Sequence, residues 1–174
     1  NNHFPLIKKV AKTGKPIIIS TGMASKKEIK EAINVAKSSG CKNIILLKCT
    51  SSYPAKYEDL NLDNIPKLIK KFKCEVGFSD HTSDDLSAQV AVSLGAKIIE
   101  KHVKLNKRMR TLDSKFSLTV DELDLYINKI RNVVSIKGNK NNFLTPSEKY
   151  ARSRKRSIYV SKDIKRGEKF TKKN

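Results

Sequence analysis

Short apolar runs alternate along this chain with longer segments whose apolar residues recur at helical spacing. Runs bounded by turn residues predict buried strands, and apolar positions three and four residues apart predict amphipathic helices. Helices are expected around residues 6–11, 26–39, 65–72, 84–94 and 118–134. Strands are expected at Pro16–Ser20, Asn43–Leu47, Val76–Phe78 and Lys97–Glu100. Strands that alternate with helices in this way predict an α/β fold with a parallel sheet.

The predicted strands share a polar cluster at each carboxyl end. These clusters are Ser20-Thr21, Thr50-Ser51-Ser52, Ser79-Asp80-His81 and Glu100-Lys101-His102. A (β/α)8 barrel places its chemistry at this end of its strands. Dinucleotide binding is not indicated, because no strand is followed by a G-x-G-x-x-G motif, and a P-loop is absent too. Since a whole barrel needs ~200 residues or more, the four βα units predict the C-terminal half of a TIM-type barrel, over residues 1–138.

Two of these clusters end in a histidine and belong to one strand–helix–strand unit, residues 76–102. The two strands of such a unit are parallel neighbours, so their carboxyl ends lie on the same side of the sheet. His81 and His102 are therefore expected to emerge together at one rim, where two imidazoles could bind a metal ion. The alternative is that one is a packed core histidine and the other a surface residue.

The composition fits a soluble globular chain, with 38% hydrophobic and 31% charged residues among 174. No run approaches the roughly 18 apolar residues of a membrane span, and the N-terminus lacks the apolar segment of a signal peptide. Because the first residue is not Met, we expect a fragment or a processed product. Cys41, Cys49 and Cys74 are an odd number without C-x-x-C spacing, which favours a reducing cytoplasm over a disulfide framework or structural zinc.

The net charge of +20 raises the alternative of a basic nucleic-acid-binding module without enzyme activity. The excess is mostly Lys and is spread over every predicted helix, a pattern typical of solvated faces. Only Lys149–Arg156 is a dense basic cluster, and no aromatic-rich RNA-binding motif accompanies it. Nucleic acid is therefore the less favoured partner.

Beyond Gly138 the sequence changes character. Residues 139–156 begin with the polar run N-K-N-N and are predicted to form a linker. Ser157–Val160 is predicted to be a strand, followed by a turn at 163–168. Because so few residues cannot build a core of their own, residues 157–174 are expected to begin a second, small and truncated domain.

Several motifs, taken in order, resemble the sialic acid synthase family, which makes N-acetylneuraminate and related nonulosonic acids such as legionaminate and pseudaminate. They are K-P-I-I-I-S-T-G-M at 15–23, C-T-S-S-Y-P at 49–54, Y-E-D-L-N-L at 57–62, G-F-S-D-H-T at 77–82 and I-I-E-K-H at 98–102. The tail S-I-Y-V-S-K-D-I-K-R-G-E is similar to the start of the family's antifreeze-like domain. The resemblance implies condensation of phosphoenolpyruvate with an N-acetylated hexosamine of the N-acetylmannosamine type, with release of phosphate.

The resemblance also implies roles for individual residues. His81 and His102 match metal ligands, for Mn²⁺ or Mg²⁺, and the ion would polarise the sugar aldehyde. The catalytic positions matched are Glu100 and Tyr53, and the substrate-binding positions are Ser20, Ser51, Ser79 and Asp113. The three serines would hold the phosphate and carboxylate of phosphoenolpyruvate, and Asp113 would bind sugar hydroxyls.

Other interpretations of these residues remain open. Hydroxyls after strands are common turn residues, and Glu100 could instead orient His102. Asp80 is expected to be structural, and Lys101 is expected to face the helix layer because side chains alternate along a strand. Another phosphoenolpyruvate-condensing barrel, such as a deoxy-sugar-acid phosphate synthase, is the alternative enzyme.

The chain departs from the family pattern in two places. Thr111-Leu112-Asp113 stands where many members have G-P-D, and the following S-K-F-S-L resembles pseudaminate-type synthases more closely. A strand that carries the family's phosphoenolpyruvate-binding Lys and an active-site Glu would precede Asn1. Without that strand, the resemblance implies that residues 1–174 alone are inactive. The family's swapped second domain implies that the full-length protein is a homodimer.

Overall fold

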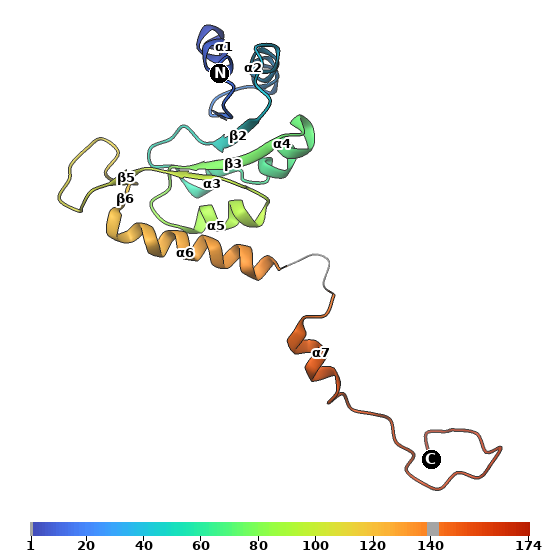
Figure 1. The fold of residues 1–174 in the computed structure, drawn as a ribbon. Coiled ribbons are helices and arrows are strands. Elements are labelled where there is room, and N and C mark those ends of the chain that lie inside the picture. The colour runs from blue at the N-terminus through green and yellow to red at the C-terminus, as the bar shows by residue number, and fades with distance from the viewer. Residues whose placement is uncertain (1, 139–142) are drawn as a thin grey trace. The chain divides into compact units, whose positions relative to one another are not determined.

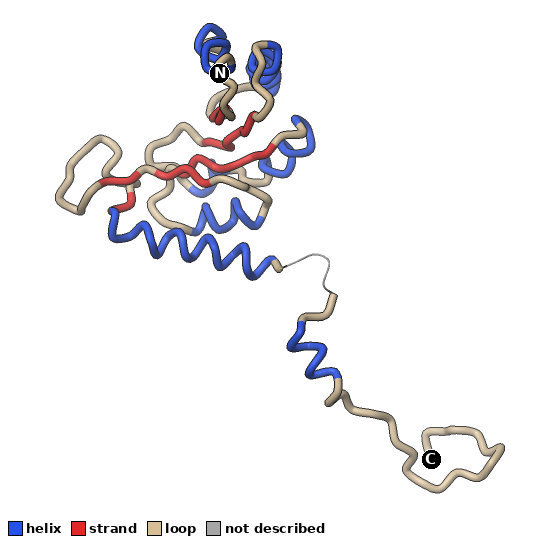
Figure 2. Tube along the Cα trace, viewed as in Figure 1, coloured by secondary structure: helices blue, strands red, loops and turns tan. Residues whose placement is uncertain are grey.

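The computed structural model describes residues 2–138 and 143–174, and the chain divides into two compact units, 1–138 and 139–174. Figure 1 traces the elements in chain order, and Figure 2 separates helices from strands. The helices are α1 (Phe4–Ala11), α2 (Lys26–Ser38), α3 (Tyr57–Leu60), α4 (Asn64–Phe72), α5 (Leu86–Ser93), α6 (Val120–Lys137) and α7 (Pro146–Arg152). The strands are β1 (Ile17–Ser20), β2 (Ile44–Cys49), β3 (Glu75–Asp80), β4 (Ile99–Lys101), β5 (Val103–Lys104) and β6 (Leu118–Thr119).

Strands β1 to β4 form one parallel sheet in chain order, with a helical connection between each pair. The sheet is curled into half of a barrel, as predicted. Its register aligns Ser20 with Leu47 and Cys49 with Ser79, and it aligns Ser79 in turn with Glu100. The carboxyl ends of the strands therefore lie at one rim, as the βα rhythm predicts.

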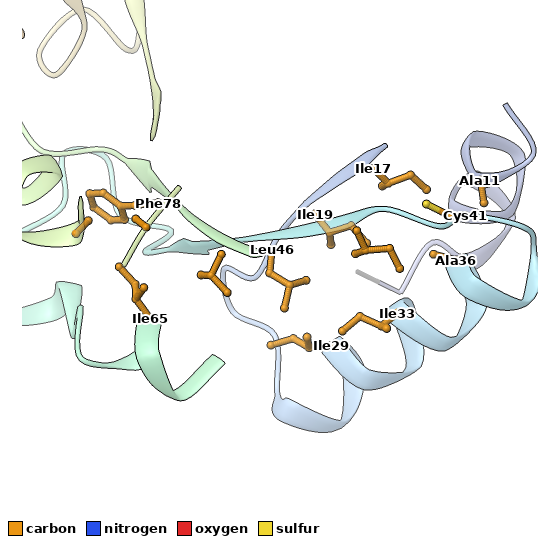
Figure 3. Packing of buried hydrophobic residues seen from close by; sticks show 14 of the residues in the cluster. Ala11, Ile17, Ile19, Ile29, Ile33, Ala36, Cys41, Leu46, Ile65 and Phe78 are labelled. Atoms are coloured by element: carbon orange, nitrogen blue, oxygen red, sulfur yellow. The ribbon is translucent and has the colours of Figure 1, made fainter. Parts of the chain in front are cut away.

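Alternation along the strands separates two faces of this sheet. On β1, Ile17 and Ile19 are buried while Ile18 and Ser20 are exposed. The buried face packs against α2 and α4, and Figure 3 shows Ile29 and Ile33 of α2 lying beneath β1 and β2. The same layer contains the following buried side chains of the sheet and of α4: Ile44, Leu46, Ile65, Val76 and Phe78. Burial of this apolar surface, at ~25 cal/mol per Å², stabilises the half-barrel on its outer side.

Local signals explain where the helices begin. Ser25 caps α2 in a capping box, because its hydroxyl accepts from the Glu28 N–H while the Glu28 carboxylate accepts from the Ser25 N–H at 2.7 Å. The N-cap of α5 is Asp85, whose side chain makes no capping hydrogen bond. The carboxylate of the preceding Asp84 accepts from the Leu86 N–H at 3.0 Å and so satisfies one donor at the start of this helix.

Three features of the half-barrel differ from the predicted elements. The short helix α3 lies between the second predicted strand and the helix predicted at 65–72, where no element was expected. The fourth strand begins and ends later than predicted, at Ile99–Lys101, and a parallel pair, β5–β6, follows it. Both strands of this pair are two residues long, too short to produce a recognisable alternation in the sequence.

In the second unit, α7 occupies part of the segment predicted to be a linker, and its N-cap Thr145 forms a capping box with Glu148. The N-K-N-N run at 139–142 lies outside the described residues. The strand predicted at Ser157–Val160 is wrong, because these residues are irregular and exposed. β-propensity alone does not make a strand, since a strand needs a partner for its backbone groups.

Within the described residues, none of the helices has the length and apolar character needed to cross a membrane. Cys41 and Cys49 are buried free thiols, and Cys74 is a partly buried one.

Candidate functional site

A groove of about 640 Å³ opens at the carboxyl rim of the sheet. Seven of the eight predicted site residues line it: Ser20, Ser51, Tyr53, Ser79, His81, Glu100 and His102. The other wall comes from α1 and the concave side of β1, including Leu6, Val10 and Ile18. A second cavity, of about 760 Å³, lies at the amino ends of the strands and contains none of the eight. The chemistry-bearing side chains are thus gathered at one end of the sheet.

The two histidines follow the last paired residues of β3 and β4, Asp80 and Lys101. Their ring centroids lie 5.3 Å apart, with the rings tilted by 66°. The predicted convergence of His81 and His102 is therefore confirmed, and neither is an isolated surface residue. His81 is 5% exposed, whereas the side chain of His102 is 37% exposed.

A backbone carbonyl orients the His81 ring. The Nδ1 atom of His81 lies 2.9 Å from the Thr50 oxygen. Since a carbonyl oxygen can only accept a hydrogen bond, Nδ1 of this ring is the protonated nitrogen. The Nε2 atom of a neutral His81 then keeps its lone pair, as a metal-binding imidazole requires.

Asp113 is the one predicted residue that does not line the groove, and it acts on His102 instead. Asp113 lies in the loop between β5 and β6, and its Oδ2 atom is 3.4 Å from Nδ1 of His102. A carboxylate beside Nδ1 favours protonation there and leaves Nε2 as the free nitrogen. Asp113 thus has a position suited to orienting an imidazole, whereas the sequence predicts a sugar-binding role for it.

An aromatic cluster surrounds the two imidazoles. Phe116 is 2% exposed, and its ring centroid lies 5.0 Å from that of His102 and 5.9 Å from that of His81. Tyr53 lies 4.4 Å from His81 and 5.7 Å from Phe116, measured between ring centroids. Phe116 thus gives the imidazoles a buried apolar neighbour, whereas Tyr53, which packs against His81, is 57% exposed.

Ser79 and Glu100 form a pair across β3 and β4. The Ser79 hydroxyl donates to Glu100 Oε1 at 2.7 Å, so its proton is engaged by the carboxylate. Glu100 is therefore held by Ser79, and the alternative in which Glu100 orients His102 is not what the structure shows, because Asp113 occupies that place.

Ser20 and Ser51 lie at the ends of neighbouring strands, where Gly22 permits a close approach. A Cβ atom at Gly22 would collide with the Ser51 hydroxyl and lie 3.2 Å from the Cys49 sulfur. The glycine of the T-G-M motif is thus required by space, which sequence spacing alone did not reveal.

Two titratable side chains near the rim have pKa values displaced by their surroundings. Burial lowers the pKa of Lys48, which lies behind the groove on the helix side and donates to the Cys49 carbonyl oxygen at 3.0 Å. A hydrogen bond to Asp84 raises the pKa of Tyr57. Neither side chain lines the groove, so these shifts belong to its surroundings.

The residues of the rim that could hold a metal ion are the two histidines. Among residues 2–138 and 143–174, no group of three or more His, Cys, Asp and Glu side chains is placed to hold a metal ion. Two ring nitrogens with fixed tautomers nevertheless fit a site whose other positions are open to substrate oxygens and water.

Sequence reasoning missed three contributors to the site, which are Phe116, the Thr50 carbonyl and Gly22. Phe116 lies in a loop between two very short strands that brings it back to the imidazoles, and the sequence has no periodic pattern that predicts this contact. The Thr50 carbonyl belongs to the backbone and has no residue-type signal. The T-G-M motif was the available signal for Gly22.

A curled parallel half-barrel with polar residues and paired imidazoles at its carboxyl rim defines the barrel class of enzymes, in which this rim carries the active site. The match to known proteins places the chain within that class. Residues 1–142 match the NeuB family, and the chain belongs to it.

Relatives in this family include the pseudaminic acid synthase of Campylobacter jejuni, 42% identical over 175 residues, with 99% of this chain and 50% of the relative covered. The human N-acetylneuraminate-9-phosphate synthase is 36% identical over 148 residues, with 84% and 41% covered. The sialic acid synthetase of Leptospira borgpetersenii superposes with a TM-score of 0.79 at 31% identity, covering 86% of this chain and 52% of that one. The chain spans about half the length of the curated relatives that it matches.

Proposed function

We propose that this chain supplies the carboxyl-rim half of the active site of a nonulosonic acid synthase. The reaction would join the vinyl carbon of phosphoenolpyruvate to the aldehyde carbon of an N-acetylated hexosamine, consume one water and release phosphate. The observation that carries the proposal is the groove. Seven residues that the family resemblance assigns to this reaction follow or end different strands, and all seven line this one groove. The family relatives, named for pseudaminic, legionaminic and sialic acid synthesis, support it.

Each kind of side chain at the rim would have its own role in this reaction. Hydroxyls of Ser20 and Ser51 would donate hydrogen bonds to the anionic groups of phosphoenolpyruvate. The Ser79–Glu100 pair would place a carboxylate beside the reacting carbons. Tyr53 and Phe116 would form an aromatic wall beside the imidazoles.

The two imidazoles would hold a divalent metal, Mn²⁺ or Mg²⁺, through Nε2. The ion would act as a Lewis acid on the sugar aldehyde. Thr50 and Asp113 would fix the two tautomers in which Nε2 is unprotonated. Two imidazoles alone bind Mn²⁺ weakly, since this ion is lowest in the divalent affinity order. We therefore expect phosphoenolpyruvate to strengthen Mn²⁺ binding by adding oxygen ligands.

The test is phosphate release by the full-length protein from phosphoenolpyruvate with three acceptor sugars. These are N-acetylmannosamine, a 2,4-diacetamido-trideoxyhexose and arabinose 5-phosphate, each with and without Mn²⁺. Metal-dependent release with an N-acetylated hexosamine is the expected result. Release with arabinose 5-phosphate alone would assign the chain to the other phosphoenolpyruvate-condensing barrels.

A further inference from the structure

An ion pair lies buried on the opposite side of the sheet from the imidazoles. Asp80 and Lys101 face each other in the last paired position of β3 and β4, with Oδ2 and Nζ 3.0 Å apart. Their side chains are 0% and 4% exposed. A buried ion pair is often no more stabilising than apolar residues of the same volume, because both charges lose their hydration. Its presence therefore points to a role in geometry.

Every oxygen of the Asp80 carboxylate is engaged. Oδ2 accepts from Lys101 and from the Tyr126 hydroxyl of α6, the latter at 3.0 Å. Oδ1 accepts from the N–H and the hydroxyl of Thr82, at 2.9 and 2.7 Å. Burial, followed by the charge of Asp80, raises the pKa of Tyr126, so its hydroxyl remains a donor. The carboxylate is thus fixed from three elements at once.

Lys101 connects this network to the two histidines. Lys101 immediately precedes His102, and its ammonium also donates to the Thr82 carbonyl oxygen. It therefore bonds to Asp80 and Thr82, the residues on either side of His81. The β3–β4 ladder ends at Asp80 and Lys101 and so does not pair the two histidines with each other; beyond it, the His81 carbonyl accepts from the Ala55 N–H and the His102 carbonyl from the Leu118 N–H. One side chain thus joins the backbone before His102 to the backbone on both sides of His81.

We propose that Lys101 and Asp80 are positioning residues for the two imidazoles, holding the His81 ring against the Thr50 carbonyl and across from His102. Alternation along the strands places the pair on the helix side and the rings on the groove side. The proposal rests on the proposed function only in that the same imidazoles would hold the metal. It concerns their orientation, which is measurable without substrate or metal.

The main test variant is the double substitution Asp80→Asn/Lys101→Met in the full-length protein. Each single substitution leaves a buried charge without its partner and is strongly destabilising, whereas the double variant removes both charges. If the pair serves stability alone, the double variant recovers both the midpoint of unfolding and the orientation of the rings. If the pair positions the rings, only the midpoint recovers.

Ring orientation is measured by long-range proton–nitrogen NMR of the neutral imidazoles in metal-free protein. In the wild type we expect one dominant tautomer of His81, with the proton on Nδ1. In the double variant we expect Nε2–H to become the major form, and we expect about tenfold weaker Mn²⁺ binding, the lower end of the effect of outer-shell partners. Tyr126→Phe, which keeps the ion pair, should shift both readouts in the same direction by less.

The matched control is Lys129→Met. Lys129 also pairs with an aspartate, with Nζ 2.5 Å from Oδ2 of Asp85, but that pair does not flank a histidine. It should leave the His81 tautomer unchanged. A folded double variant that retains the wild-type tautomer would overturn the proposal. Loss of the tautomer without any Mn²⁺ binding in the wild type would instead uphold the positioning and count against the proposed function.

Discussion

The two faces of the sheet differ most where the strands end. On the helix side, the side chains of Phe78 and Asp80 are fully buried and every polar atom of Asp80 is bonded. On the groove side, Ser20 and Glu100 are exposed, and the imidazoles keep one nitrogen free. Because neighbouring residues in a strand point to opposite faces, a few consecutive residues serve both purposes. One face fixes the backbone so that the other can present reactive groups.

The largest expected contrast compares Phe78→Ala with Ser20→Ala. Removing the fully buried Phe78 ring leaves a cavity between β3 and the helix layer and should cost about 3–5 kcal/mol of unfolding free energy. Removing the exposed Ser20 hydroxyl should change stability by less than about 0.5 kcal/mol. Urea unfolding of the two variants measures this difference.

The same two variants should reverse their order in function. Loss of a hydrogen bond to an anionic substrate corresponds to about a tenfold rise in KM for phosphoenolpyruvate in Ser20→Ala. Folded Phe78→Ala, assayed at low temperature, should keep a KM close to the wild type. Equal stability losses in the two variants would show that the two faces do not differ in the way described.

A smaller effect is expected from Gly22→Ala, which crowds the groove side next to Ser51 and Cys49. The new methyl group collides with the Ser51 hydroxyl, and such overpacking costs about 1 kcal/mol where the neighbour can move. Adding Ser51→Ala should relieve the collision, so the double variant should be more stable than the sum of the two single effects. Additive effects in this cycle would contradict the contact.

The smallest effect is a pH dependence on the helix side, at the capping box of α2. Hydrogen bonds from the Ser25 hydroxyl and N–H lower the pKa of Glu28 below 4.5 in the folded state. The stabilisation is therefore fully present above pH 4.5 and is lost as pH falls through the lower, folded value. Glu28→Gln should unfold with a shallower dependence on acid than the wild type, in urea titrations at a series of pH values. Identical acid profiles would exclude a contribution from this cap.

Much of this arrangement was predictable because it depends on periodicity. The spacing of Ile29, Ile33 and Ala36 predicts α2, and the order of strand, helix and strand predicts that His81 and His102 meet at one rim. Lys101 facing the helix layer follows from alternation alone, and the structure confirms it.

The remaining features depend on contacts between distant segments, which periodicity does not encode. Phe116 and Asp113 reach the imidazoles only because the β5–β6 loop returns to the rim. The apolar run Ser157–Val160 has strand propensity but no strand to pair with among the described residues. The antifreeze-like domain and the homodimer accordingly stay predictions.

The most direct test of the account is phosphate release by the full-length protein carrying His81→Ala or His102→Ala, with His3→Ala as the matched control. His3 also borders the groove, but it caps α1 through a hydrogen bond from the Leu6 N–H and has no place in the imidazole pair. We predict that each rim variant folds and loses at least about a hundredfold in metal-dependent turnover, since the Lewis acid contributes several kcal/mol, while His3→Ala remains close to the wild type. Wild-type turnover in either rim variant would contradict the account.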